Sequence, residues 1–113
     1  MKIVEETIGD VLVEIINVDR PSFSEAESLK SMISEKIDAG MNKIVVDLSA
    51  CEFVDSTFLG VLVSTLRKVT KLDGDLRLVG FKPAVRAMFE LTRLFRVFET
   101  YGDLKEAVGS FNK

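Results

Sequence analysis

Three small polar residues, Asp55-Ser56-Thr57, occupy the position in this chain where side-chain chemistry is best supported. They follow an apolar, β-like stretch and precede the longest amphipathic segment, so the pattern predicts that the chain passes from a strand to a helix there. A helix amino terminus exposes unpaired backbone N–H groups and the positive end of the helix dipole. Asp55 or Ser56 could cap the helix by accepting from those N–H groups, which contributes about 1 kcal/mol.

A serine hydroxyl at such a junction is also a position where an added phosphate would have large effects. The helix amino terminus would stabilise the dianion. The phosphate would also make the surrounding surface, expected to be rimmed by Phe58 and Leu59, strongly negative. A partner with an acidic or apolar surface would then be repelled. From the residues alone, Ser56 is either a helix cap or the site of a chemical switch.

Other kinds of chemistry have little support. The chain has no histidine, the usual general base and the commonest transition-metal ligand, and it has no glycine-rich phosphate loop. Asp47, Glu52 and Asp55 are close in sequence, but nothing indicates that they converge in a cleft. Cys51 has no basic neighbour in sequence and is expected to be a small buried side chain. We therefore expect no enzymatic activity, no cofactor and no metal.

The composition is that of one globular domain, residues 1–113. The chain is 47% hydrophobic and 29% charged, with a formal net charge of −3, which gives no support for direct binding to nucleic acid. A single cysteine fits a reducing compartment. The amino terminus becomes acidic too early for a signal peptide, and no run approaches the roughly 20 apolar residues of a membrane span. We expect a cytoplasmic protein, and its oligomeric state stays unknown.

The hydrophobic pattern predicts the elements that position the junction. Gly9-Asp10 is a turn signal, and Pro83 marks a helix start. Capping-box spacing occurs twice, in Ser22 with Glu25 and in Ser24 with Glu27. Strands are predicted at residues 2–7, 10–17, 43–48 and 75–80, with a brief extended piece at 94–98. Helices are predicted at residues 22–39, 57–71, from 82 onward, and 103–108. The order β β α β α β α (β) α predicts an α/β fold with a mixed, mostly parallel central sheet of four to five strands.

The junction resembles a known signature. Asp55-Ser56-Thr57-Phe58-Leu59-Gly60 is similar to the Asp-Ser-[Ser/Thr]-Gly-Leu-Gly motif of bacterial anti-sigma factor antagonists, which are members of the STAS domain family. The resemblance covers nearly the whole chain, including the runs Lys43–Ser49, Phe53-Val54, Leu78–Val85 and Met88–Phe95. It implies a single STAS-type domain.

The resemblance also implies a function. In that family, the serine after the signature aspartate is phosphorylated by a partner that is both an anti-sigma factor and an ATP-dependent serine kinase. The unphosphorylated form binds this kinase and frees the sigma factor, phosphorylation ends the binding, and a serine phosphatase restores it. Carried over, the phosphoacceptor is Ser56, with Thr57 the weaker candidate. The partner-binding residues implied are Asp19, Asp55, Ser56, Thr57, Phe58 and Leu59.

Two departures from the family pattern concern the partner surface. Phe58 replaces the first glycine of the signature, and its ring could contact the partner or pack against a neighbouring loop. Asp19 resembles the aspartate of the family's Gly-Glu-Leu-Asp stretch, but the glycine and glutamate are absent. An alternative function is an accessory STAS subunit of a transporter or stress-sensing multiprotein assembly without a phosphorylation cycle. A nucleotide-binding domain is a third reading, disfavoured because no phosphate loop is present.

Overall fold

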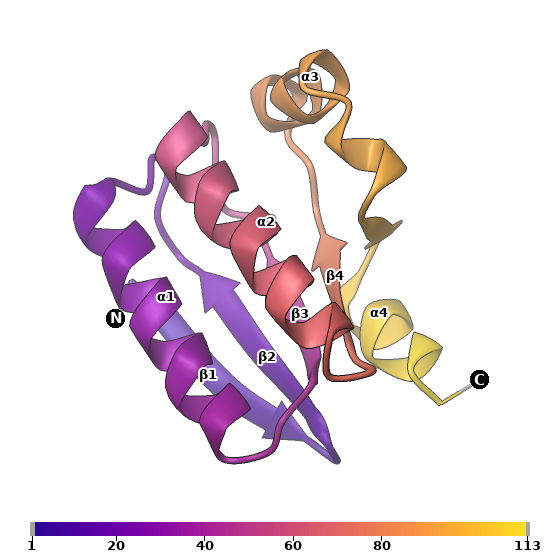
Figure 1. The fold of residues 1–113 in the computed structure, drawn as a ribbon. Coiled ribbons are helices and arrows are strands. Elements are labelled where there is room, and N and C mark those ends of the chain that lie inside the picture. The colour runs from indigo at the N-terminus through magenta and orange to yellow at the C-terminus, as the bar shows by residue number, and fades with distance from the viewer. Residues whose placement is uncertain (1, 113) are drawn as a thin grey trace.

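A five-stranded mixed sheet forms the centre of the computed structural model, which describes residues 2–112 (Figure 1). The strands are β1 (Ile3–Ile8), β2 (Val11–Ile16), β3 (Lys43–Asp47), β4 (Asp75–Val79) and β5 (Glu99–Tyr101). They lie in the order β1-β2-β3-β4-β5, with β1 antiparallel to β2 and the other pairs parallel. This architecture confirms the predicted fold class.

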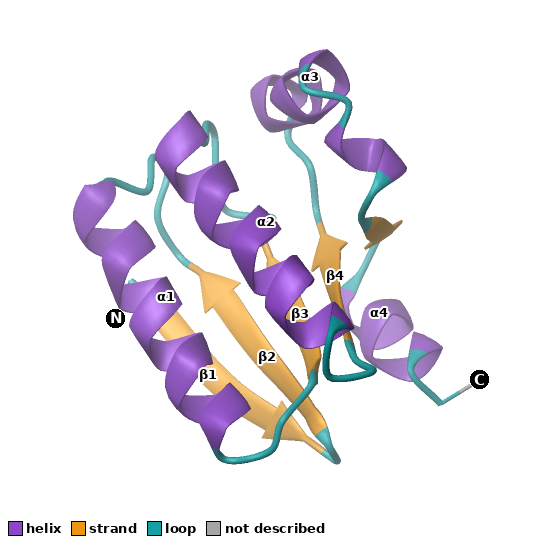
Figure 2. Cartoon of the chain, viewed as in Figure 1, coloured by secondary structure: helices purple, strands orange, loops and turns teal. Residues whose placement is uncertain are grey.

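Four α-helices connect and follow these strands (Figure 2). They are α1 (Phe23–Asp38), α2 (Ser56–Thr70), α3 (Pro83–Leu91) and α4 (Leu104–Ser110). Of the two capping boxes that the sequence allows, the one of Ser22 with Glu25 forms: the Ser22 side chain accepts from the helix backbone, and the Glu25 side chain accepts from the Ser22 N–H. Proline at the first position of α3 is also as expected.

Alternating side chains of the strands build two cores, one on each face of the sheet. Toward α1 and α2, which lie side by side in Figure 1, the central strands contribute residues such as Leu12, Ile44 and Leu78. Toward α4 they contribute Val13 and Val45, among others. The central strand β3 is therefore buried on both faces, which explains its continuous β-branched run.

The extended piece predicted at residues 94–98 is wrong. Residues Leu94–Arg96 form a 3₁₀ turn, and the fifth strand begins only at Glu99. Phe95 and Phe98 are three positions apart, a helical spacing, and both rings contact that of Phe89. Packing into this aromatic cluster, which also includes Phe81, holds the segment in a turn rather than a strand.

Candidate functional site

The predicted junction lies at the carboxyl edge of the sheet. Because β2, β3 and β4 are parallel, their carboxyl ends meet at one edge, where ligand and partner sites of open α/β sheets are usually found. The segments that follow these strands are residues 17–22, 48–55 and 80–82. The first and second of these segments are joined by backbone hydrogen bonds.

Asp19 holds the loop that precedes the junction. Its backbone carbonyl accepts hydrogen bonds from the N–H groups of Glu52 and Phe53, at 2.7 and 3.1 Å. The other side of the loop is tied to β4, because the Leu48 N–H donates to the carbonyl of Val79 at 2.8 Å. The structure therefore brings Asp19, predicted from sequence as a site residue, next to the loop that leads to Ser56. The bonds that do so involve its backbone, and its side chain is exposed.

Asp55, and not Ser56, caps α2. The Asp55 side-chain oxygen accepts from the N–H of Phe58 at 2.9 Å, and its backbone is extended as in an N-cap residue. Ser56 is the first residue of the helix and is exposed. Within residues 2–112 its hydroxyl takes part in no side-chain hydrogen bond. The serine hydroxyl is thus free of the capping role that the sequence left open.

The exposed face of the first helical turn continues from Ser56 to Gly60. These two residues are four positions apart, so they lie above one another on the same side of α2. Thr57 is exposed beside them. A Cβ added at Gly60 would meet nothing within 4 Å, so bare backbone lies next to the serine. A partner surface can approach closely here.

Phe58 and Leu59 do not form the exposed apolar rim expected from the sequence. Phe58 is completely buried and Leu59 is only 5% exposed. The Asp55 cap fixes the rotation of the helix so that Phe58 aligns with the buried residues Leu62 and Val69. The bulky ring is therefore part of the core. Neither side chain offers a surface for a partner in this conformation.

The acidic side chains near the junction have separate partners. Asp47 accepts from both the N–H and the hydroxyl of Ser49, at 2.9 and 2.6 Å. Glu52 accepts from the Lys82 ammonium at 2.9 Å, and this bond raises the pKa of Lys82 above its ordinary value. Asp55 is occupied as the cap, so each of the three acids has a partner of its own.

Cys51 is buried below the same loop, as the sequence predicted. Its Sγ lies 3.8 Å from the carbonyl oxygen of Ile16. Burial is the main cause that raises the pKa of its thiol to about 12. Since the thiolate is the nucleophile, this cysteine is unreactive at neutral pH.

Gly80 is required where β4 leaves the sheet. Its φ of +78° is in the left-handed region, and a Cβ there would lie 2.1 Å from the Ser49 hydroxyl oxygen. The backbone of the β4 end thus passes directly against the loop that follows β3. This close approach keeps the two loops of the carboxyl edge in a fixed relation.

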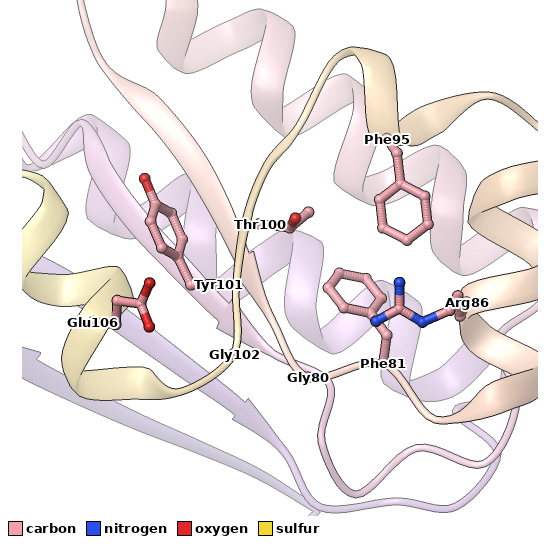
Figure 3. A pocket seen from close by; sticks show the side chains of 8 residues that line it. All are labelled: Gly80, Phe81, Arg86, Phe95, Thr100, Tyr101, Gly102 and Glu106. Carbon is pink, nitrogen blue, oxygen red and sulfur yellow. The ribbon is translucent and has the colours of Figure 1, made fainter.

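A cavity of about 340 Å³ lies between residues of the α3 region and α4 (Figure 3). Phe81 and Phe95 form one part of its wall, and the Arg86 side chain lies against both rings. Glu106 lines the opposite side. None of the site residues predicted from sequence lines this cavity.

The fold and the capped serine junction define the class of this protein. The family model of the STAS domain matches residues 4–107, and the chain belongs to that family. Within residues 2–112, no helix is long and apolar enough to cross a membrane, and no cluster of three or more candidate ligands for a metal ion is found.

Relatives that match over nearly the whole chain are anti-sigma factor antagonists by name. The TM1081 homologue of Thermotoga neapolitana, assigned to that class, is 30% identical over 95% of this chain and 91% of its own. An anti-sigma factor antagonist from Mycobacterium paratuberculosis has a similar structure, with a TM-score of 0.86, 28% identity and 98% and 93% coverage of the two chains. Unphosphorylated SpoIIAA, at 20% identity and a TM-score of 0.86, shares the fold over 97% of this chain and 96% of its own.

Proposed function

We propose that this protein is an anti-sigma factor antagonist controlled by phosphorylation of Ser56. In the unphosphorylated state it binds an anti-sigma factor that is also a serine kinase, and the sigma factor is released. The observation that carries this proposal is the exposed hydroxyl of Ser56, which stands at the start of α2 while Asp55 supplies the cap. The relatives named as anti-sigma factor antagonists support it.

At Ser56 a phosphate would be stabilised by the helix and would also change the charge of the contact surface. The first N–H groups of α2 and the helix dipole favour a dianion there. The phosphate would add a charge of about −1.5 to −2 to an edge that already carries Asp19, Glu52 and Asp55. Each partner carboxylate facing this dianion at about 4 Å would be repelled by about 2–8 kcal/mol, depending on exposure. A partner that fits the neutral serine would therefore dissociate.

The proposed contact surface consists of the exposed residues around the serine. Asp19, Ser56 and Thr57 belong to it, together with the bare backbone at Gly60. Asp55 is half-buried and acts mainly as the cap. Phe58 and Leu59 are left out because they are buried. Thr57 is the second hydroxyl available to the kinase.

In this proposal the chain itself catalyses no reaction. The kinase partner supplies ATP chemistry, and a serine phosphatase resets the switch. The alternative, an accessory STAS subunit of a transporter, has only fold-level support. The murine Slc26a9 anion transporter contains this fold at a TM-score of 0.72 and 17% identity, with the match covering 91% of this chain and 18% of the transporter chain.

The test is a comparison of Ser56→Ala and Ser56→Asp as baits, with Thr57→Ala as the matched control. We expect Ser56→Ala and Thr57→Ala to retain an anti-sigma factor and Ser56→Asp to lose it. Incubation of the parent chain with that protein and ATP should place a single phosphate on Ser56. Phosphate on another residue, or equal retention by Ser56→Asp and Ser56→Ala, contradicts the proposal.

A further inference from the structure

The segment 82–97, called here the α3 lobe, projects from the carboxyl edge of the sheet. It contains α3 and the 3₁₀ turn, and Figure 1 shows it at the same end of the molecule as the amino terminus of α2. Only Val85 and Phe89 of α3 are buried, and they anchor the helix on the aromatic cluster. The opposite side of the helix faces solvent.

The solvent side of the α3 lobe carries large apolar side chains. Leu91 is 82% exposed and Val97 is 55% exposed. Leu91 continues a helical stripe through Ala84 and Ala87, which are also exposed. A stripe of this kind has no packing role within the chain, so its burial would require another molecule.

The charge of the lobe is opposite to that of the whole chain. It carries Lys82, Arg86, Arg93 and Arg96 but only one acid, Glu90, whereas the chain has a formal net charge of −3. Within residues 2–112, the three arginines take part in no ion pair. The Arg86 guanidinium lies 5.8 and 5.7 Å from the ring centres of Phe81 and Phe95 (Figure 3). Its N–H groups remain available to a carboxylate.

Arg93 is kept in a backbone conformation that suits glycine. It follows the end of α3 with φ +60° and ψ +24°, the left-handed position at which helices commonly end in glycine. An arginine there costs free energy that glycine would not. Its side chain is exposed, and within residues 2–112 it takes part in no ion pair that would offset this cost. The unfavourable backbone is consistent with a role for the arginine outside the folded chain.

We propose that the α3 lobe is a second docking surface for the same anti-sigma factor, fitted to an acidic surface with an apolar recess. This inference rests on the proposed function. Leu91 and Val97 would enter the recess, and Arg93 and Arg96 would pair with carboxylates at its rim. The lobe is continuous with the proposed contact surface around Ser56, called here the serine surface. Lys82, at the start of the lobe, binds Glu52, which lies four residues before Ser56.

A protein surface fits these features better than a lipid surface. The chain as a whole is acidic and would be repelled from an anionic membrane, while the positive lobe alone would be attracted. The exposed large apolar side chains of the lobe are only two, Leu91 and Val97. Binding to lipid is therefore kept as an outcome of the test.

The first experiment is photo-crosslinking in cells with p-benzoylphenylalanine in place of Leu91, Thr57 or Lys71. Lys71 is an exposed residue at the far end of α2 and serves as the control. We expect the Leu91 and Thr57 probes to link to one and the same anti-sigma factor, and the Lys71 probe not to. If Thr57 links to an anti-sigma factor and Leu91 does not, the lobe inference is wrong and the proposed function stands. If Thr57 links to none, both fail.

The second experiment measures affinity for that anti-sigma factor. We expect the double variant Arg93→Gly/Arg96→Ser to bind about tenfold more weakly and with less dependence on salt. The matched control Arg67→Ser/Lys68→Ser removes the same charge from the other end of α2 and should change binding less than about twofold. Since glycine suits position 93, reduced binding by Arg93→Gly alone, without reduced thermal stability, separates docking from folding.

Equal affinity of the parent and the double variant would overturn the inference. So would flotation with vesicles of equal parts phosphatidylglycerol and phosphatidylcholine that is lost in the double variant, because the lobe would then be a lipid surface. Ser56→Asp, measured beside these variants, reports on the serine switch independently of the lobe.

Discussion

At the start of α2, Asp55 caps the helix and the neighbouring Ser56 presents an exposed hydroxyl. Asp55 satisfies the backbone N–H of Phe58, and this leaves Ser56 with no structural duty. A serine that also capped the helix could not be modified without loss of the cap. The separation explains how a phosphate could be added and removed at Ser56 with little effect on the fold.

This division predicts different stabilities for two variants. Asp55→Ala should lower the free energy of unfolding by about 1 kcal/mol, because the cap is lost. Ser56→Ala should leave it within about 0.5 kcal/mol of the parent, as for an exposed residue without bonds. Urea unfolding followed by circular dichroism measures both. Equal destabilisation by the two changes would mean that Ser56 shares the cap.

Glu14 is the other residue whose environment gives a measurable prediction. It is completely buried on β2 and lies opposite Glu5 of β1 in the sheet register. The only cation close to this pair within residues 2–112 is Lys36, whose Nζ is 3.8 Å from Glu5. Burial, and next the contact with Glu5, raise the pKa of Glu14 from an ordinary 4.5 to about 9. In the folded chain this carboxyl is therefore protonated at neutral pH.

Because of the raised pKa of Glu14, the stability of the protein should depend on pH. In the unfolded chain Glu14 loses its proton above pH 4.5, while in the folded chain it keeps it to about pH 9. The folded state thus binds more protons, and stability should fall across this range by at most about 1.4 kcal/mol per pH unit. Glu14→Gln, which stays neutral, should remove the fall and be more stable than the parent in alkali. A parallel fall in this variant would exclude Glu14 as its source.

At the scale of elements, much of the fold could be predicted because the buried face of each helix or strand determines the spacing of its apolar residues. Local sequence patterns predict the strands β1 to β4, the capping box of α1 and the junction at Asp55. The sequence leaves Phe58 open between partner contact and packing against a loop, although it stands at helical spacing from the buried Leu62, Thr65 and Val69. Thr65 is a polar residue in this otherwise apolar line, which weakens the pattern.

The fifth strand was misplaced for a different reason. The turn before this strand depends on Arg93 in the left-handed conformation. Glycine is the residue that usually adopts this conformation, so an arginine there gives no sequence signal for a turn. The aromatic cluster that holds the turn joins residues from β4's end, α3 and the 3₁₀ turn. Contacts of this kind are set by tertiary packing and leave no local pattern.

Two glycines of the carboxyl edge should respond in opposite ways to alanine. Gly80→Ala should destabilise the protein by more than about 1 kcal/mol, because its Cβ would collide with Ser49 and its φ is +78°. Gly60→Ala should stabilise it by up to about 1 kcal/mol, since the site is helical and open. Thermal unfolding of both variants is the measurement. Destabilisation by Gly60→Ala would show that the helix face beside Ser56 is not open.

At the scale of the whole molecule, charge is distributed unevenly along the carboxyl edge. The serine surface is acidic around Asp19 and Glu52, and the α3 lobe beyond Lys82 is basic. A phosphate on Ser56 would increase this contrast without a change of fold. Under the proposed function, the switch would act through the electrostatics of one edge and would need no rearrangement of the sheet.

The most direct test of the central claim uses a chain that carries phosphoserine at position 56 only. Its affinity for the anti-sigma factor is compared with that of the unmodified chain by calorimetry, and circular dichroism checks that the fold is unchanged. We predict that the phosphate weakens binding at least about a hundredfold, which corresponds to about 2.7 kcal/mol. Affinities within about twofold of each other, with the fold intact, would contradict the account.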